Sequence, residues 1–182
     1  ARLGSMYVAA YPNEGPLEKT ARIMAMTAHW NQRRKYTNDP YIVHPAAVVG
    51  LVRSVPHSDQ MLAAAWLHDV VEDCNIDILT IANVCGDGVA HMVSKLTGIS
   101  KKDDGNRKTR KRIDREWIET SHRDTKTIKL ADLIDNTISI MAHDHNFAKV
   151  YLKEKRELLE VLRDGDPSLW AKADKICREA GY

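Results

Sequence analysis

Apolar residues recur at helical spacing along most of the chain. Between residues 17 and 31 they fall every three or four positions, which predicts a first helix. The same periodicity predicts further helices at about 45–55, 62–75, 78–84, 89–96, 124–141, 147–163 and 169–180. Proline, glycine and asparagine separate these segments. We therefore expect an all-α fold, a single bundle of roughly 8–10 helices.

Two of the predicted helices are divided into an apolar and a chemically reactive side. In the segment 62–75, a rotation of about 100° per residue places His68, Asp69, Glu72 and Asp73 in one arc, opposite Ala, Leu and Val side chains. The segment 124–141 repeats this division. Its apolar side consists of Leu130, Leu133, Ile134, Ile138 and Met141, and its polar side of Lys129, Asp132, Asp135, Asn136 and Ser139. Both helices thus offer one face for packing and one for chemistry.

Composition narrows the class of protein. The 182 residues are 43% hydrophobic and 29% charged, as in an ordinary globular domain, and one Phe and nine Gly disfavour a strand-rich sandwich. A net charge of +2 gives no case for a nucleic-acid partner, and no apolar run reaches the roughly 18 residues of a membrane span. Three cysteines without metal-type spacing indicate reduced thiols in a cytoplasmic protein. Residues 1–5, ahead of Met6, resemble an expression remnant, which leaves residues 6–182 as one domain.

Four residues suggest a divalent metal site: His44, the adjacent His68 and Asp69, and Asp132. Two imidazoles and two carboxylates suit Mn²⁺, Fe²⁺, Co²⁺ or Zn²⁺ better than Mg²⁺ or Ca²⁺. A lone His-Asp pair is more often a hydrogen-bonded pair in the core. The additional His44 and Asp132 favour a metal, provided that the helices pack around one point.

Three motifs carry a family resemblance. They are Pro-Tyr-Ile-Val-His-Pro at 40–45, Leu-His-Asp-Val-Val-Glu-Asp at 67–73 and Thr-Ile-Lys-Leu-Ala-Asp-Leu-Ile-Asp-Asn at 127–136. In order and approximate spacing they closely resemble the HD-type hydrolase domain of the RelA/SpoT family. The turn at 85–90 resembles another part of that domain, with Cys85 in place of an aromatic residue. The resemblance covers about residues 21–142.

The resemblance implies an activity. It implies one Mn²⁺ ion held by His44, His68, Asp69 and Asp132, and removal of the 3′-pyrophosphate of (p)ppGpp-type alarmones to give GDP or GTP plus pyrophosphate. The long family members continue into a synthetase domain. Because this chain ends at Tyr182, we expect a stand-alone small alarmone hydrolase, similar to the animal SpoT-like hydrolases.

Glu72 and Asp73 are the candidate catalytic residues. They lie one helical turn beyond His68 and Asp69, where they could steer or deprotonate a water molecule. Two close carboxylates should push their pKa values apart, so that one accepts a proton while the other donates. Solvated acids near a helix C-terminus are the alternative interpretation, but the helix dipole disfavours them there.

Basic residues are the candidate substrate contacts. Arg33, Arg34 and Lys35 precede the His44 motif, and an arginine side chain could stack on a nucleobase. The sequence leaves open which of the three does so. Asn136 should reach the ribose or a phosphate, and Lys129 shares its helix face. Phosphate contacts are also expected from a basic run that could equally be a solvated loop, namely Arg107, Lys108, Arg110 and Lys111, and less strongly from Tyr151 and Arg156.

Two rival functions stay open. An HD phosphohydrolase could act on another nucleotide: an adenosine alarmone, the 2′-phosphate of NADPH, a dNTP or a nucleoside monophosphate. A helical module that binds a nucleotide without turnover is the other, although no metal-ligand or acid position is lost. The expected partner is a small-molecule nucleotide, with neither nucleic acid nor membrane, and the sequence leaves open whether the chain forms a homo-oligomer.

Overall fold

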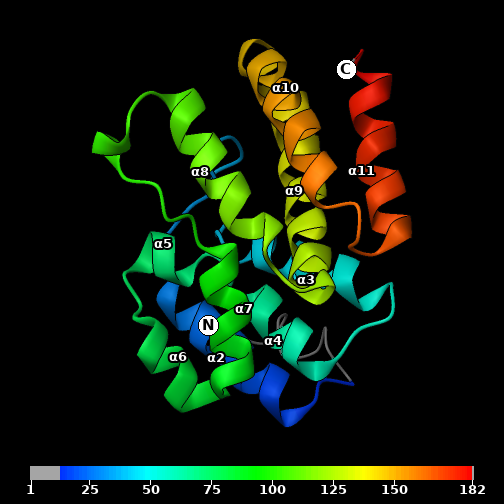
Figure 1. Ribbon diagram of the computed structural model, residues 1–182. Coiled ribbons are helices and arrows are strands. Elements are labelled where there is room, and N and C mark those ends of the chain that lie inside the picture. Colours follow the sequence, from blue (N-terminus) through cyan, green and yellow to red (C-terminus); the bar gives the residue numbers. More distant parts are fainter. Residues whose placement is uncertain (1–12, 182) are drawn as a thin grey trace.

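The computed structural model describes residues 13–181, and in this part of the chain helices joined by loops make up the fold (Figure 1). One isolated antiparallel bridge, between Arg33 and Pro40, closes the loop after the first described helix. The helices, in chain order, are α2 (Pro16–Ala28), α3 (Val43–Arg53), α4 (Asp59–Leu67), α5 (Val70–Cys74), α6 (Ile78–Cys85), α7 (Asp87–Leu96), the 3₁₀ helix η1 (Lys102–Asp104), α8 (Arg107–Glu119), α9 (Arg123–His143), α10 (His145–Val161) and α11 (Pro167–Glu179).

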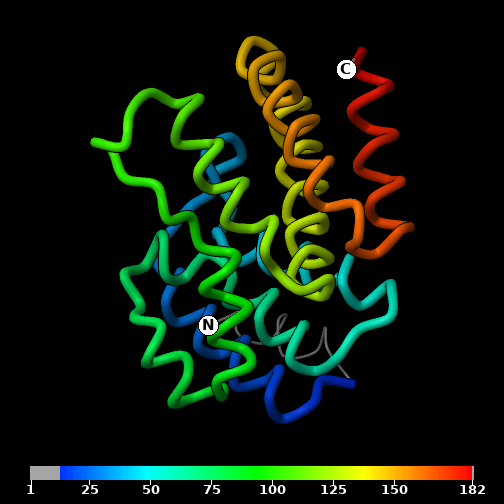
Figure 2. The backbone as a smooth tube through the Cα atoms, in the orientation of Figure 1, coloured from blue at the N-terminus to red at the C-terminus, as the bar shows by residue number. Residues whose placement is uncertain are grey.

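This order confirms the predicted all-α class. Within the described residues, no helix is long and apolar enough to cross a membrane. The predicted remnant at residues 1–5 lies outside the described part. In the backbone trace, α9, α10 and α11 run side by side, while α2 and α4–α7 form a second group (Figure 2).

The predicted continuous helix over 62–75 is wrong, because the chain breaks at His68 and Asp69. Helix α4 ends at Leu67 and α5 begins at Val70. The His68 ring donates from Nδ1 to the Ala65 carbonyl oxygen at 2.8 Å, so a side chain takes a backbone acceptor of the last turn. Asp69 becomes the N-cap residue of α5. The break lets both side chains turn toward the same point, with 3.1 Å between His68 Nε2 and Asp69 Oδ2.

The full length of α8 was not predicted, because its charged residues resembled a solvated loop. The helix begins at Asn106, whose side chain accepts a hydrogen bond from the Thr109 amide at 3.0 Å. Ile118 is the one fully buried residue of this helix, and residues such as Ile113 and Trp117 are half-buried. A helix with so few apolar positions escapes a periodicity search.

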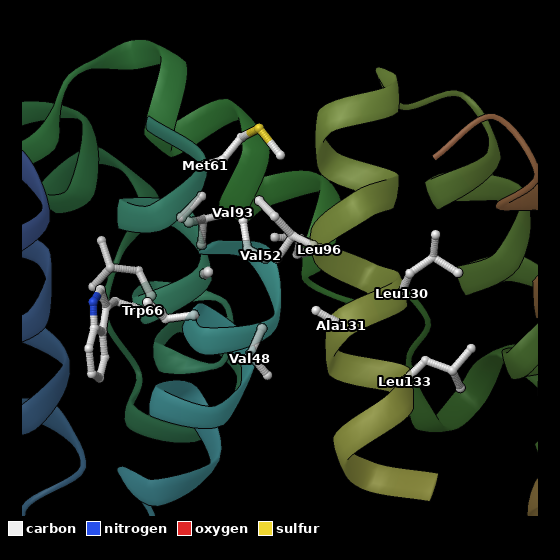
Figure 3. Close-up of a cluster of buried hydrophobic side chains, with 14 of the residues drawn as sticks. Val48, Val52, Met61, Trp66, Val93, Leu96, Leu130, Ala131 and Leu133 are labelled. Atoms are coloured by element: carbon white, nitrogen blue, oxygen red, sulfur yellow. The ribbon is translucent and has the colours of Figure 1, made fainter. Parts of the chain in front are cut away.

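Helix α9 passes through the centre of the core. Ala131 points toward Val48 of α3, whereas Leu130 and Leu133 project from the other side of the helix (Figure 3). All four side chains are buried. Because other helices pack against both sides of α9, polar residues of this helix such as Asp132 are buried. Ile138, predicted to be packed, is 52% exposed; it lies about 80° around the helix from Leu130, at the edge of the apolar stripe.

Candidate metal centre and its flanking clefts

Four polar side chains converge where α3, the α4–α5 break and α9 meet. His44 comes from the first turn of α3, His68 and Asp69 from the break, and Asp132 from the middle of α9. The helices α3, α4 and α9 pack against one another, which brings these distant segments together. The two histidines and Asp132 are buried, and Asp69 is half-buried. The condition set by the sequence, that the helices meet at one point, is met.

The two imidazoles are oriented by their other nitrogens. His44 Nδ1 lies 2.6 Å from Asp135 Oδ2, and His68 Nδ1 lies 2.8 Å from the Ala65 carbonyl oxygen. Both partners are acceptors, so each Nδ1 carries the hydrogen and each Nε2 keeps its lone pair when the ring is neutral. The two Nε2 atoms face each other at 3.2 Å. Two opposed lone pairs repel, and a cation between them removes that repulsion.

The spacing of the donor atoms also suits a metal ion. His44 Nε2 lies 3.2 Å from Asp132 Oδ1 and 3.6 Å from Asp69 Oδ2, and His68 Nε2 lies 3.7 Å from Asp132 Oδ1. Ligand atoms about 2.1 Å from a common ion lie about 3.0–3.4 Å apart. His44, His68 and Asp69 form a group that could hold a metal ion. The residues therefore fit a divalent cation.

The protonation behaviour of the site agrees with this fit. Burial lowers the pKa of both imidazoles, but the neighbouring carboxylates, Asp69 and Asp132 at His68 and Asp132 and Asp135 at His44, more than offset it, so both pKa values lie above the ordinary value. Burial likewise opposes ionisation of Asp69, yet His68 holds the pKa of that carboxyl well below its usual range. When no metal ion is bound, protons on the two imidazoles therefore supply the positive charge beside the carboxylates. Metal binding would release them.

A second layer of side chains holds the carboxylates. The Tyr41 hydroxyl donates to Asp69 Oδ2 at 2.6 Å. Asn136 Nδ2 donates to Asp132 Oδ1 at 2.6 Å, and Lys129 Nζ to Asp132 Oδ2 at 2.8 Å. Asn136 and Lys129, predicted as substrate contacts, thus lie directly against Asp132. The sequence did not identify Tyr41 and Asp135 as site residues, although they lie in the motifs at 40–45 and 127–136.

Glu72 and Asp73 are adjacent but are held by different segments. Glu72 accepts a hydrogen bond from the Gly98 amide, and burial raises its pKa above the usual range. Asp73 accepts from Gln32 Nε2 at 2.8 Å, and the Gln32 amide oxygen lies 2.7 Å from His29 Nδ1. The buried His29 ring is thus linked to Asp73 through Gln32. Glu72 itself lines one of two hollows beside the candidate metal centre, whereas Asp73 is connected to the other through Gln32.

The first hollow, which we call the loop pocket, has a volume of about 340 Å³. The predicted basic residues Arg33, Arg34 and Lys35 line it together with Asn136. Arg34 lies 5.8 Å from the centre of the Tyr41 ring and 3.6 Å from Asp135 Oδ2, which ties it to the metal centre. Arg33 is exposed, and Lys35 lies over the Tyr36 ring at 4.9 Å.

The second hollow, which we call the basic cleft, has a volume of about 170 Å³ and lies between the α7–α8 segment, α9 and α10. Glu72 and Lys129 form the part of its wall nearest the metal centre. Its charged residues are the cations Lys95, Lys111, Arg115, Lys129 and Lys155 and the carboxylates Glu72, Asp114 and Glu154. The cleft thus carries more positive than negative groups.

Most of the predicted phosphate contacts lie outside the two hollows. Arg107 forms a two-pronged ion pair with Glu154, at 2.6 and 2.9 Å, and Lys108 is exposed and lines neither hollow. Arg156 pairs with Asp174 of α11. Of the basic run at 107–111, Lys111 lines the basic cleft.

A family model and a solved structure of known proteins both match this chain. The family model of the HD domain matches residues 21–159. A solved structure of a metazoan SpoT ortholog that hydrolyses ppGpp superposes with a TM-score of 0.82 at 27% identity, covering 92% of this chain and 97% of that one.

Part of the chain is also similar in sequence to bacterial pyrophosphohydrolases. A probable guanosine-3′,5′-bis(diphosphate) 3′-pyrophosphohydrolase of Synechocystis is 46% identical over 77 residues, 42% of this chain and 10% of that protein. The corresponding pyrophosphohydrolase of Aquifex aeolicus is 29% identical over 154 residues, 84% of this chain and 22% of that protein. The chain thus spans between a tenth and about a fifth of the length of these two relatives. It belongs to the HD-domain family and, within that family, is related to the SpoT-type hydrolases.

Proposed function

We propose that this protein is a metal-dependent phosphohydrolase that removes the 3′-pyrophosphate of (p)ppGpp-type alarmones. The observation that carries the proposal is the pair of opposed His44 and His68 Nε2 atoms, 3.2 Å apart, with carboxylate oxygens of Asp69 and Asp132 beside them. The metazoan relative that hydrolyses ppGpp covers nearly the same length of chain. This similarity supports the choice of substrate.

We assign the metal to His44, His68, Asp69 and Asp132, and name Mn²⁺ as the ion to test first. Two imidazole and two carboxylate donors suit an ion of this class. When bound, such an ion polarises a phosphoryl oxygen and lowers the pKa of a water molecule toward neutrality.

The two hollows would divide the substrate between them. A nucleoside fits the loop pocket, where the Arg34 guanidinium can stack on a base and Asn136 can reach a ribose hydroxyl. The phosphates fit the basic cleft, where Lys129 offers positive charge. The scissile bond then lies between the hollows, above the metal centre.

Glu72 and Asp73 would handle the protons of the reaction. Glu72 borders the basic cleft, and its raised pKa brings it closer to the operating range of a general acid or base. Asp73, held by Gln32 of the loop pocket, would orient the attacking water or the ribose. Tyr41 fixes Asp69 and so preserves the geometry of the donor set.

The test is a panel of nucleotides incubated with the Mn²⁺-loaded protein, with chromatographic identification of products. We expect ppGpp to yield GDP and pyrophosphate, and Asp132→Asn to lose both metal and turnover. Intact ppGpp alongside cleavage of an adenosine alarmone, a dNTP or NADPH would assign the site to another nucleotide. Metal binding with no turnover of any of these compounds would favour a binding module.

A further inference from the structure

Lys155 is a half-buried cation of α10 that has no counter-ion among the residues that the structure describes. It forms no ion pair there, and its Nζ lies over the Tyr151 ring, 4.5 Å from the ring centre. Burying an ammonium group is costly unless a negative charge accompanies it. Such a position calls for a partner.

The carboxylates around Lys155 are already engaged. Glu154 is held by both prongs of the Arg107 guanidinium. Asp132 accepts from Lys129 and Asn136. The described chain thus offers Lys155 no unengaged carboxylate among these neighbours, and a bound anion would supply the opposite charge.

Other carboxylates of the basic cleft are engaged as well. Asp114 accepts hydrogen bonds from the Ile99 and Ser100 amides at 2.9 Å each, and Glu72 accepts from the Gly98 amide. Lys111, on the α8 side of the same cleft, also forms no ion pair within the described residues. Two lysines from different helices thus face one hollow without carboxylate partners.

We propose that Lys155, together with Lys111, binds a phosphoryl group of a pyrophosphate-type anion in the basic cleft. The identity of the anion rests on the proposed function, which supplies two sources of the same chemistry: the scissile pyrophosphate and the 5′-diphosphate of the nucleotide. Ammonium groups from two helices would hold it by charge-assisted hydrogen bonds. Lys155 is then a substrate-binding residue rather than a structural one.

The protonation of Lys155 supports this role. Burial and the neighbouring Lys129 lower its pKa to about 7, and Lys111 adds to the effect while Asp132 and Glu154 oppose it. A bound anion would reverse the balance and raise that pKa, since an opposite charge favours the protonated form. Anion binding and protonation of Lys155 should therefore be linked.

The experiment compares Lys155→Met with Lys153→Met in the full chain at a fixed free Mn²⁺ concentration. Lys153 lies on the same helix, is exposed and lines neither hollow. Inorganic pyrophosphate and GDP are titrated separately by calorimetry. We expect Lys155→Met to weaken at least one of them about tenfold, the loss of one charge-assisted contact, and Lys153→Met to leave both unchanged.

The two probes distinguish the sources. A loss confined to pyrophosphate assigns Lys155 to the scissile group, and a loss confined to GDP assigns it to the 5′-diphosphate. Unchanged affinity for both, or an equal loss in Lys153→Met, would overturn the inference even if ppGpp is hydrolysed. Lys155-dependent binding of pyrophosphate in a protein that leaves ppGpp intact would sustain the inference and reject the proposed function. Removing a half-buried cation that forms no ion pair within the described residues should not prevent folding, which circular dichroism checks.

Discussion

The hydrogen bond between His44 and Asp135 orients the His44 ring at the candidate metal centre. His44 Nδ1 lies 2.6 Å from Asp135 Oδ2, three residues beyond Asp132 on α9, so one helix supplies both a ligand candidate and the group that orients another. The remaining nitrogen, Nε2, is thereby directed at His68 and Asp132. Second-layer carboxylates of this kind fix the tautomer of a ligating histidine and raise its basicity.

Asp135→Ala should therefore weaken metal binding without removing any proposed ligand. We expect a loss of about 10–100-fold in Mn²⁺ affinity, the usual effect of deleting a second-layer partner. Asp135→Asn keeps an acceptor oxygen and should retain most of the affinity. Calorimetric titration of the metal-free proteins checks this, and equal losses in the two variants would contradict it.

Glu72→Gln should abolish turnover while leaving the metal in place. Loss of a general acid or base costs about 10²–10⁴-fold in kcat, and the amide has nearly the same shape. Because desolvation raises the Glu72 pKa, a Glu72 carboxylate that acts as general base forms at higher pH than usual, and the acidic limb of the wild-type kcat profile should reflect it. The variant should lack that limb. Metal content measured by mass spectrometry is the control, and full activity would remove Glu72 from the mechanism.

Gly98→Ala should impair the same step by displacing Glu72. A methyl group at Gly98 would lie 3.1 Å from Glu72 Oε1 and 3.2 Å from Asp114 Oδ1, so both carboxylates must move. We expect kcat to fall severalfold with unchanged Mn²⁺ affinity. Gly50→Ala is the matched control, since nothing lies within 4 Å of its added carbon. An unimpaired Gly98→Ala enzyme would show that the Gly98 amide does not position Glu72.

Arg34, rather than Arg33, should recognise the nucleoside. Both line the loop pocket, but Arg34 is half-buried beside Tyr41 and Asp135, whereas Arg33 is exposed. Arg34→Ala should raise KM about tenfold, as expected for a desolvated cation–π contact. Arg33→Ala should change KM much less. Steady-state kinetics with ppGpp decide between them, and the reverse order would assign the base to Arg33.

Asp166 should stabilise the fold in a pH-dependent manner. Its side chain accepts hydrogen bonds from the Ser168 and Leu169 amides at the start of α11. Burial alone would raise the Asp166 pKa, but the Ser168 side chain and these amides lower it below the usual range. Asp166→Ala should cost about 1 kcal/mol of unfolding free energy near neutral pH.

The sign of the pH dependence follows from the lowered pKa. The stabilisation is fully present above the unfolded-state pKa of about 4 and is lost as the pH falls through the lower folded-state value. Denaturant unfolding of the wild type and Asp166→Ala between pH 7 and pH 3 measures the difference. If the difference in unfolding free energy between the two proteins grew as the pH fell, the hydrogen bonds of the Asp166 carboxylate would not be its cause.

Local sequence was sufficient to predict the helical class and to single out the side chains that meet at the candidate metal centre. Helical periodicity depends on neighbours three and four residues apart, and His44, His68 and Asp132 each lie in a short motif beside apolar positions. The charged helix α8 was missed because few of its residues are buried.

Tertiary structure decided what those side chains do. The break between α4 and α5 turns His68 and Asp69 toward one point, and it arises from a side-chain hydrogen bond that periodicity does not register. Glu72 and Asp73 are separated by contacts with Gly98 and Gln32, 26 and 41 residues away in the chain. The isolation of Lys155 likewise depends on which carboxylates other helices have already engaged. The orientation and the partners of these side chains depend on long-range packing and on competition for hydrogen-bond partners. The identity of the candidate metal ligands, in contrast, could be predicted from the sequence alone.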